Sequence, residues 1–164
     1  ATEVVKDFSK IYKKKWLEMM RKKLGLLGEE IKDEKLITDL LTWMHKNKAD
    51  YTNTFCFLMN QNNEKKKYKD QEFLDWKKQW HTRLKLNNNI PEESLKLMSL
   101  SNPRVIPRNH KVEEALEAAN SGNLKPTINL LKILKKPFED KKEISEYQSA
   151  APISNKKYKT FCGT

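Results

Sequence analysis

Residues 70–84 read DQEFLDWKKQWHTRL, and this stretch decides the fold class. Phe73, Trp76 and Trp80 follow one another at intervals of three and four residues, which places their rings on one side of an α-helix. Asp70 precedes them and is a residue type that caps helix N-termini. Aromatic stripes can also stack nucleic-acid bases, but those platforms usually lie on sheets or in grooves. We therefore interpret this stripe as the core face of a helix.

The same helical spacing of apolar residues continues on both sides of this stretch. Gly25 is expected to end the first helix, because glycine accepts the positive φ of a helix C-terminus. Asp33, Asp50 and Asn109 are expected N-caps. Pro137 is expected to end the last helix, because proline has no amide hydrogen and clashes with the preceding turn. The expected helices are 8–24, 33–44, 50–58, 70–84, 91–98, 109–119 and 126–134.

No window alternates apolar and polar residues as a strand would, so the sequence predicts an all-α fold. We expect an irregular bundle of about six to seven helices within residues 1–138. Residues 139–164 are polar and are predicted to form an extended C-terminal tail that carries Cys162. The sequence begins at Ala1 without an initiator Met, so we expect a piece of a longer protein.

The composition limits the kinds of partner that this chain is expected to bind. The 164 residues are 37% hydrophobic and 34% charged, with a net charge of +11. This charge would attract nucleic acid, yet no recognition motif accompanies it, so we expect no nucleic-acid partner. No run approaches the roughly 18 apolar residues that span a bilayer. Two cysteines are too few for a disulfide scaffold, which is typical of an intracellular protein.

The residue pattern also excludes several kinds of active site. Only four glycines occur, too scattered to form the loops that cradle phosphates in Walker, Rossmann or kinase motifs. His45, His81 and His110 lie far apart and lack the local spacing of zinc ligands. We therefore expect this chain by itself to have no catalytic, cofactor-binding or metal-binding residues.

One stretch, NPRVIPRNH at residues 102–110, resembles neither helix nor ordinary surface. Pro103 and Pro107 hold the backbone extended there, because each also excludes its predecessor from the α region. Arg108 and His110 could contact a partner or a nucleotide, or they could hydrogen-bond neighbouring helix ends. We favour the second interpretation, since such links commonly satisfy helix-end carbonyls.

Several stretches together resemble the C-terminal part of the selenoprotein O family, called YdiU in bacteria. In order they are MRKKLGL at 20–26, ADYTNTF at 49–55, the stretch 76–84 with Trp80 and Arg83, NP at 102–103, IPRNH at 106–110, VE at 112–113, LL at 130–131, PF at 137–138 and FCGT at 161–164. Asp50, Tyr51, Asn102, Pro103, Pro107, Arg108, Asn109 and His110 are the motif residues that we expect to be structural.

The resemblance implies a kinase-like enzyme that transfers AMP from ATP to protein hydroxyl groups with the help of a divalent metal such as magnesium. Its nucleotide and metal ligands would lie upstream, so the implied partners of this chain are the kinase-like core of the same protein and that protein's substrates. The implied location is the bacterial cytoplasm or the mitochondrion. The alternative is a basic helical module that binds nucleic acid or another protein.

The resemblance also implies a redox or regulatory role for Cys162, since family members carry Cys or selenocysteine near the C-terminus. A thiol on an accessible tail can exchange disulfides, although an inert terminal Cys is the competing interpretation. Where relatives tend to have Arg after DYTNTF, this chain has Cys56, which we expect to pack rather than react. The sequence leaves open whether Cys56 and Cys162 form a disulfide, because that depends on the distance and orientation of the two side chains.

Overall fold

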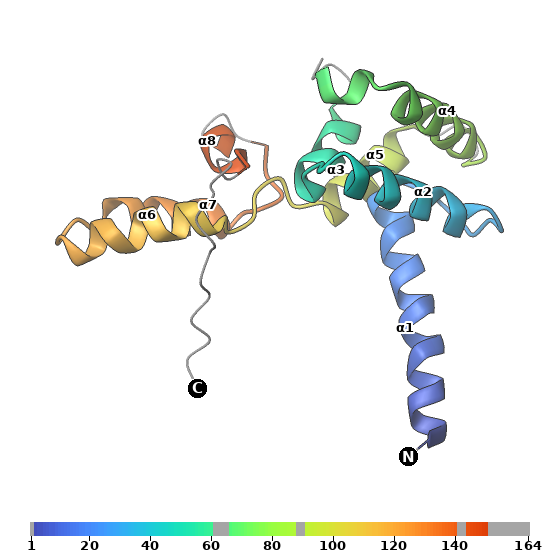
Figure 1. Cartoon of the computed structure of the whole chain (residues 1–164), viewed down its shortest axis with the longest axis horizontal. Helices are drawn as coiled ribbons and strands as arrows, with labels where there is room; N and C mark the ends of the chain where they lie inside the picture. The colour runs from blue at the N-terminus through green and yellow to red at the C-terminus, as the bar shows by residue number, and fades with distance from the viewer. Residues whose placement is uncertain (1, 61–65, 88–90, 141–143, 151–164) are drawn as a thin grey trace. The chain divides into compact units, whose positions relative to one another are not determined.

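The computed structural model describes residues 2–60, 66–87, 91–140 and 144–150 (Figure 1). Every regular element in these ranges is helical, which confirms the predicted all-α fold. The chain divides into two compact units, Ala1–Arg104 and Val105–Thr164. The first unit holds α1 (Thr2–Lys23), α2 (Asp33–Lys46), α3 (Tyr51–Met59), the 3₁₀ helix η1 (Lys66–Lys69), α4 (Gln71–Lys85) and α5 (Pro91–Ser101). The second holds α6 (Asn109–Asn120), α7 (Lys125–Leu134) and α8 (Ser145–Gln148).

The aromatic stripe of α4 forms the centre of the first unit's core. Phe73, Trp76 and Trp80 are all buried, which confirms their assignment to a core face. The Trp76 indole donates a hydrogen bond to the carbonyl of Leu36, and the Trp80 indole donates one to the carbonyl of Leu24. Each tryptophan therefore contributes apolar area and also satisfies a polar backbone group that is out of reach of water.

The end of α1 depends on Gly25, which has a φ of 69°. The amide of Leu26 bonds to the carbonyl of Arg21, and the amide of Gly25 bonds to the carbonyl of Lys22. These two bonds form a Schellman motif. A Cβ at residue 25 would lie 2.8 Å from the carbonyl oxygen of Ser94, so α5 also requires glycine here.

Of the three expected N-caps, Asp50 is confirmed, whereas Asp33 and Asn109 are wrong. Asp70, near which the aromatic helix was expected to begin, is also an N-cap. The Asp50 carboxylate accepts a hydrogen bond from the amide of Asn53, and that of Asp70 accepts one from the amide of Phe73. Asp33 is instead the first residue of α2, and its carboxylate is the centre of a buried ion-pair cluster. Asn109 is the first residue of α6, because extended backbone geometry places the N-cap at Arg108.

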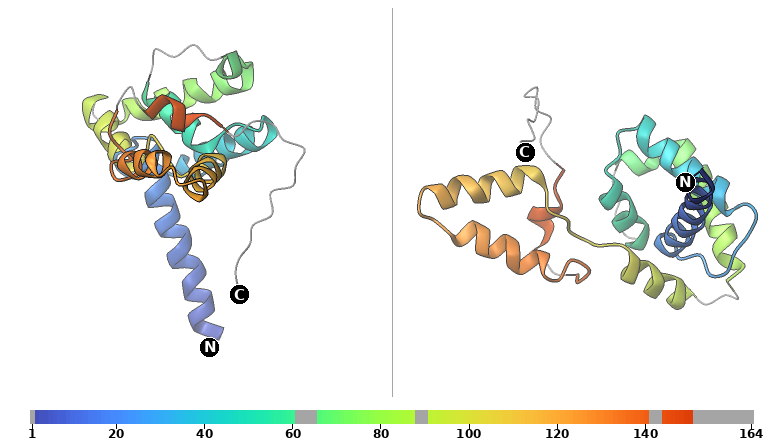
Figure 2. Two further views of the ribbon diagram at one scale, coloured as in Figure 1. Left: turned by 90° about the vertical axis from the view of Figure 1, so that its left-hand side faces the viewer. Right: turned by 90° about the horizontal axis from the view of Figure 1, so that it is seen from below.

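The second unit is built on α6 and α7, which lie side by side (Figures 1 and 2). Its described buried apolar residues are few: Val105, Ala115, Leu130 and Ile144. Residues 145–148 form the single turn α8 within the stretch that the sequence predicted to be extended. This turn is held to α6 by the ion pair between Lys111 and Glu146, 3.0 Å apart.

Candidate functional site

Two of the motif stretches, DYTNTF and NP, meet at Lys23 near the end of α1. The Lys23 ammonium donates a hydrogen bond to the Asn102 side-chain oxygen over 3.1 Å. It also lies 5.3 Å from the ring centre of Tyr51 and 4.8 Å from that of Phe55. These distances allow cation–π attraction. Burial lowers the pKa of Lys23, so its contacts with these rings and with Asn102 compensate for water that the ammonium has lost.

Asn102 is one of the most buried polar residues of the first unit, with 1% of its surface exposed. Its amide nitrogen donates to the carbonyl of Lys23 over 2.8 Å and to that of Met98 over 2.9 Å. It therefore joins the C-terminal ends of α1 and α5 and satisfies a carbonyl at each.

Cys56 lies beside the same stretch. Its thiol is 3.7 Å from the carbonyl oxygen of Pro103, within reach of a weak hydrogen bond, and the residue is only 8% exposed. Burial of this kind keeps a thiol from exchange partners in solution. The expectation that Cys56 packs in the core is confirmed. Cys162, the predicted redox position, lies outside the described residues.

A second cluster was not predicted: Asp33 is shared by two arginines. The Nε of Arg21 is 2.8 Å from Asp33 Oδ2, and the Nε of Arg83 is 2.7 Å from Oδ1. The carboxylate is fully buried and also accepts the amide of Glu30. Burial by itself would raise the pKa of Asp33, but the hydrogen bonds from Arg83, Glu30 and Arg21 outweigh it and hold the pKa below its ordinary value.

Asn87 extends this cluster to α5. Its side-chain oxygen accepts hydrogen bonds from Arg83 and from the amide of Leu27. Its amide nitrogen donates to the carbonyl of Gly25 and to the Ser94 hydroxyl. The cluster thereby joins α1, α2, α4 and α5 through the loop at residues 24–32. The charged side chains of the cluster pair with one another, as expected of a buried network that fixes the positions of helices.

The remaining motif residues, 107–110, belong to the second unit. Pro107 and Asn109 are exposed. The Arg108 guanidinium donates to the carbonyl of Gln148, the last residue of α8, over 3.4 Å. The Nδ1 atom of His110 is buried and has no hydrogen-bond partner among the described residues. Arg108 thus contacts a helix end.

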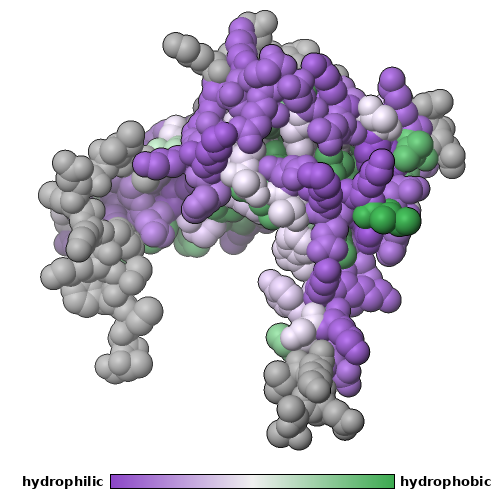
Figure 3. All heavy atoms as spheres, turned by 45° about the vertical axis from the view of Figure 1, so that its right-hand side comes forward, coloured by the Kyte–Doolittle hydropathy of each residue, from purple (hydrophilic) through white to green (hydrophobic). Residues whose placement is uncertain are grey.

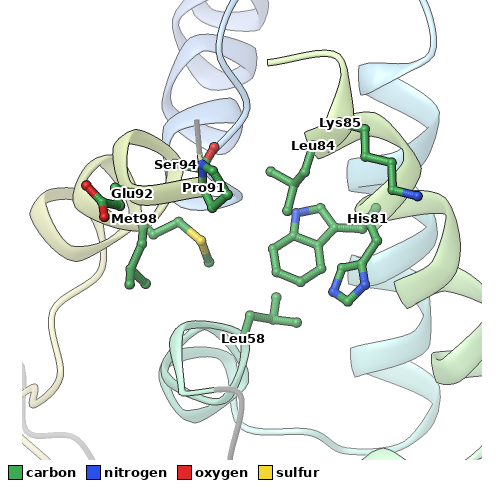
Figure 4. A pocket seen from close by; sticks show the side chains of 10 residues that line it. Leu58, His81, Leu84, Lys85, Pro91, Glu92, Ser94 and Met98 are labelled. Atoms are coloured by element: carbon green, nitrogen blue, oxygen red, sulfur yellow. The ribbon is translucent and has the colours of Figure 1, made fainter. Parts of the chain in front are cut away.

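The first unit carries a groove between α4 and α5 that is bordered by Leu58 of α3 (Figure 4). Its volume is about 370 Å³, and Leu58, Leu84 and Met98 give it an apolar interior. His81 lies at its edge, where burial and the charges of Lys77 and Lys85 lower the pKa of the imidazole. The polar residues that line the groove are His81, Lys85, Glu92 and Ser94, and most of the others are apolar.

Within the described ranges, no group of three or more His, Cys, Asp or Glu side chains is arranged to hold a metal ion. The helices in those ranges also include none that is both long enough and apolar enough to cross a membrane.

Comparison with known proteins accounts for the motif stretches. The family described as "Protein adenylyltransferase SelO" matches residues 2–135. The chain belongs to the SelO family. This confirms the resemblance drawn from the MRKKLGL, DYTNTF and IPRNH stretches.

Curated SelO relatives carry the name "Protein nucleotidyltransferase YdiU". The one from Pelagibacter ubique is 50% identical over 165 residues, that from Alcanivorax borkumensis 45% over 166, and that from Nitrosococcus oceani 43% over 166. Each match covers 100% of this chain and 34% of the relative. The chain therefore spans about a third of the length of these SelO relatives.

Proposed function

We propose that this chain is the helical C-terminal portion of a protein adenylyltransferase, and that it supports the catalytic part rather than performing catalysis. The observation that carries the proposal is the SelO family match over residues 2–135. The chain spans only 34% of its relatives, which leaves most of their length for a separate catalytic region.

The reaction proposed for the whole protein is AMP transfer. The oxygen of a protein hydroxyl group attacks the α-phosphorus of ATP, the bond from that phosphorus to the bridging oxygen breaks, and pyrophosphate leaves. The hydroxyl proton passes to a base or to solvent. ATP and magnesium would bind outside this chain. In support, Asp33 and Asp70 accept hydrogen bonds from protein groups inside the first unit.

The proposed role of the chain is to hold its helices in a fixed arrangement beside the catalytic region. Three features of the first unit support this role: the aromatic core of α4, the Asp33 cluster with its two arginines, and the Lys23–Asn102 contact. Each joins helices that are distant in sequence, and buried networks of this kind make a packed arrangement more specific. Cys162 is proposed as a redox position that acts on the catalytic part.

The test uses the full-length protein with ATP labelled on either the α- or the γ-phosphate. AMP transfer predicts protein labelling from α-labelled ATP and none from γ-labelled ATP. Labelling from γ-labelled ATP would indicate phosphoryl transfer instead. No labelling from either, with a panel of protein substrates and magnesium or manganese present, would contradict the proposed activity. The same assay on the 164-residue chain should give no labelling.

An intracellular location is part of the proposal, and the bacterial names of the relatives support the cytoplasm. The proposed partners are the catalytic region of the same polypeptide and the proteins that it modifies.

A further inference from the structure

Helix α1 presents an apolar face that the rest of its unit does not cover. Phe8, Ile11 and Tyr12 are 65%, 60% and 60% exposed, and Met19 is 43% exposed. Figures 1 and 2 show that the N-terminal part of α1 projects away from α2 to α5. Figure 3 shows pale and green side chains along this helix, within a surface that is mostly hydrophilic.

This exposed stripe differs from the face by which α1 joins the core. At 100° per residue, Phe8, Ile11, Tyr12 and Met19 lie on one side of the helix, centred about 140° from the buried residues Met20 and Leu24. The Phe8 and Tyr12 rings stack on each other with centres 6.2 Å apart. Stacking on each other leaves both rings largely exposed. Helix α1 therefore has two apolar faces, and only one of them packs against the rest of this unit.

A helix in this situation needs a partner. Isolated helices shorter than about 12–15 residues are marginal in water, and helices in proteins are stabilised mainly by packing of an apolar face. Large apolar side chains at successive turns of one helical face are the usual anchors of a helix lying in a groove.

The length of the relatives indicates what covers the stripe. We propose that it packs into an apolar groove on the part of the same polypeptide that is absent from this chain. The chain covers only 34% of its relatives, so roughly two thirds of such a protein remains to supply this groove. The inference rests on the part of the proposed function that makes this chain one portion of a longer protein, and it is independent of the reaction.

The area that the stripe can bury favours a partner segment in the same polypeptide over a second copy of the chain. Four side chains of this kind can bury roughly 400–500 Å², well below the ~800 Å² per partner of a stable association between separate chains. A covalently connected partner is held at high effective concentration, so a smaller contact suffices. Residues 7–16 include four lysines and one aspartate, so the edge of the groove should carry carboxylates.

Photo-crosslinking of the full-length protein tests this assignment. A benzophenone amino acid at residue 12 should form an intramolecular cross-link to a peptide outside the present 164 residues, identified by mass spectrometry. The same group at residue 10, on the opposite side of α1, should give at least fivefold less of that product. Cross-links between two copies, cross-links only within these 164 residues, or equal yields from both positions would overturn the proposal.

Amide hydrogen exchange in the full-length protein gives a second readout. Residues 7–16 should exchange at least 100-fold more slowly than an unstructured peptide, at a rate independent of protein concentration. Ile11→Gln should lose at least tenfold of this protection and Lys10→Gln should not, while amides 73–80 of α4 stay protected in both and report that the fold persists. Exchange at the unstructured rate in the wild type, or protection that increases with concentration, would contradict the proposal. Neither experiment uses nucleotide, so a failure of AMP transfer would leave their outcome unchanged.

Discussion

The Nε of Arg83 lies 2.7 Å from Oδ1 of Asp33, although fifty residues separate the two in sequence. Arg21 reaches the other oxygen of the same carboxylate, so one buried negative charge holds together α1, α2 and α4. This relationship gives Asp33 a role that its position at the start of a helix does not suggest.

Replacing Arg83 with Met should destabilise the first unit strongly. The substitution leaves a fully buried carboxylate with one arginine fewer, and breaking a buried pair from one side costs about 3–5 kcal/mol. Urea unfolding followed by tryptophan fluorescence would measure it. Lys78→Met is the matched control, because Lys78 pairs with Asp75 at the surface of the same helix and should leave the unfolding free energy unchanged. Equal effects of the two variants would contradict the importance of the buried cluster.

Gly25→Ala should be much more destabilising than Gly28→Ala. Both glycines have a φ of 69°, so each alanine carries the left-handed backbone cost of about 1–2 kcal/mol. Only at residue 25 would the new Cβ also meet the Ser94 carbonyl oxygen, at 2.8 Å, and such overpacking adds about 1–3 kcal/mol. Thermal or urea unfolding of both variants measures the difference between them, which reports the cost of the contact with α5. A larger effect at residue 28 would refute this reading of the α1 end.

Asp70→Ala should cost more than Asp50→Ala, although both remove an N-cap. The loss of a capping carboxylate costs about 1 kcal/mol. Asp70 also accepts the indole N–H of Trp43 over 2.7 Å, and leaving a largely buried donor without its partner adds roughly 1–3 kcal/mol. The double variant Asp70→Ala, Trp43→Phe separates the two contributions in a thermodynamic cycle. Additive effects would show that the Trp43 bond contributes nothing.

The first unit should lose stability when the pH falls below about 6.5, the ordinary pKa of histidine. The pKa of His81 is lowered in the folded state by burial and by Lys77 and Lys85. The unfolded chain therefore takes up this proton first, and stability falls from that pH downward through the folded pKa. Urea unfolding at pH 7.5 and 5.5 should show a smaller loss for His81→Gln than for the wild type. An identical loss would assign the pH dependence to other groups.

Cys162→Ser should remove any difference in AMP transfer between the oxidised and reduced full-length protein, if the tail thiol regulates the reaction. Labelling from α-phosphate-labelled ATP would be compared with and without dithiothreitol. Cys56→Ser is the matched control, because Cys56 is buried and should leave the redox response intact. An activity that is insensitive to reduction in the wild type would eliminate the regulatory role.

Sequence reasoning recovered the helices because their signals are local. The apolar spacing of Phe73, Trp76 and Trp80, the caps at Asp50 and Asp70 and the stop at Gly25 each depend on residues within a few positions of one another. It misassigned Asp33 for the same reason. An aspartate at the start of a helix has the composition of an N-cap, and nothing nearby in the sequence indicates that Arg83 will neutralise it.

By itself, the sequence determined that this protein is helical, where most of its helices begin and end, and the family to which it belongs. These properties depend on local periodicity, on capping chemistry and on motif identity, all of which can be read along the chain. Only the tertiary structure decided that Asp33 is the shared partner of two arginines, that Lys23 joins DYTNTF to Asn102, and that Phe8, Ile11 and Tyr12 remain uncovered. The physical reason is that burial and ion pairing depend on which distant segments meet in space.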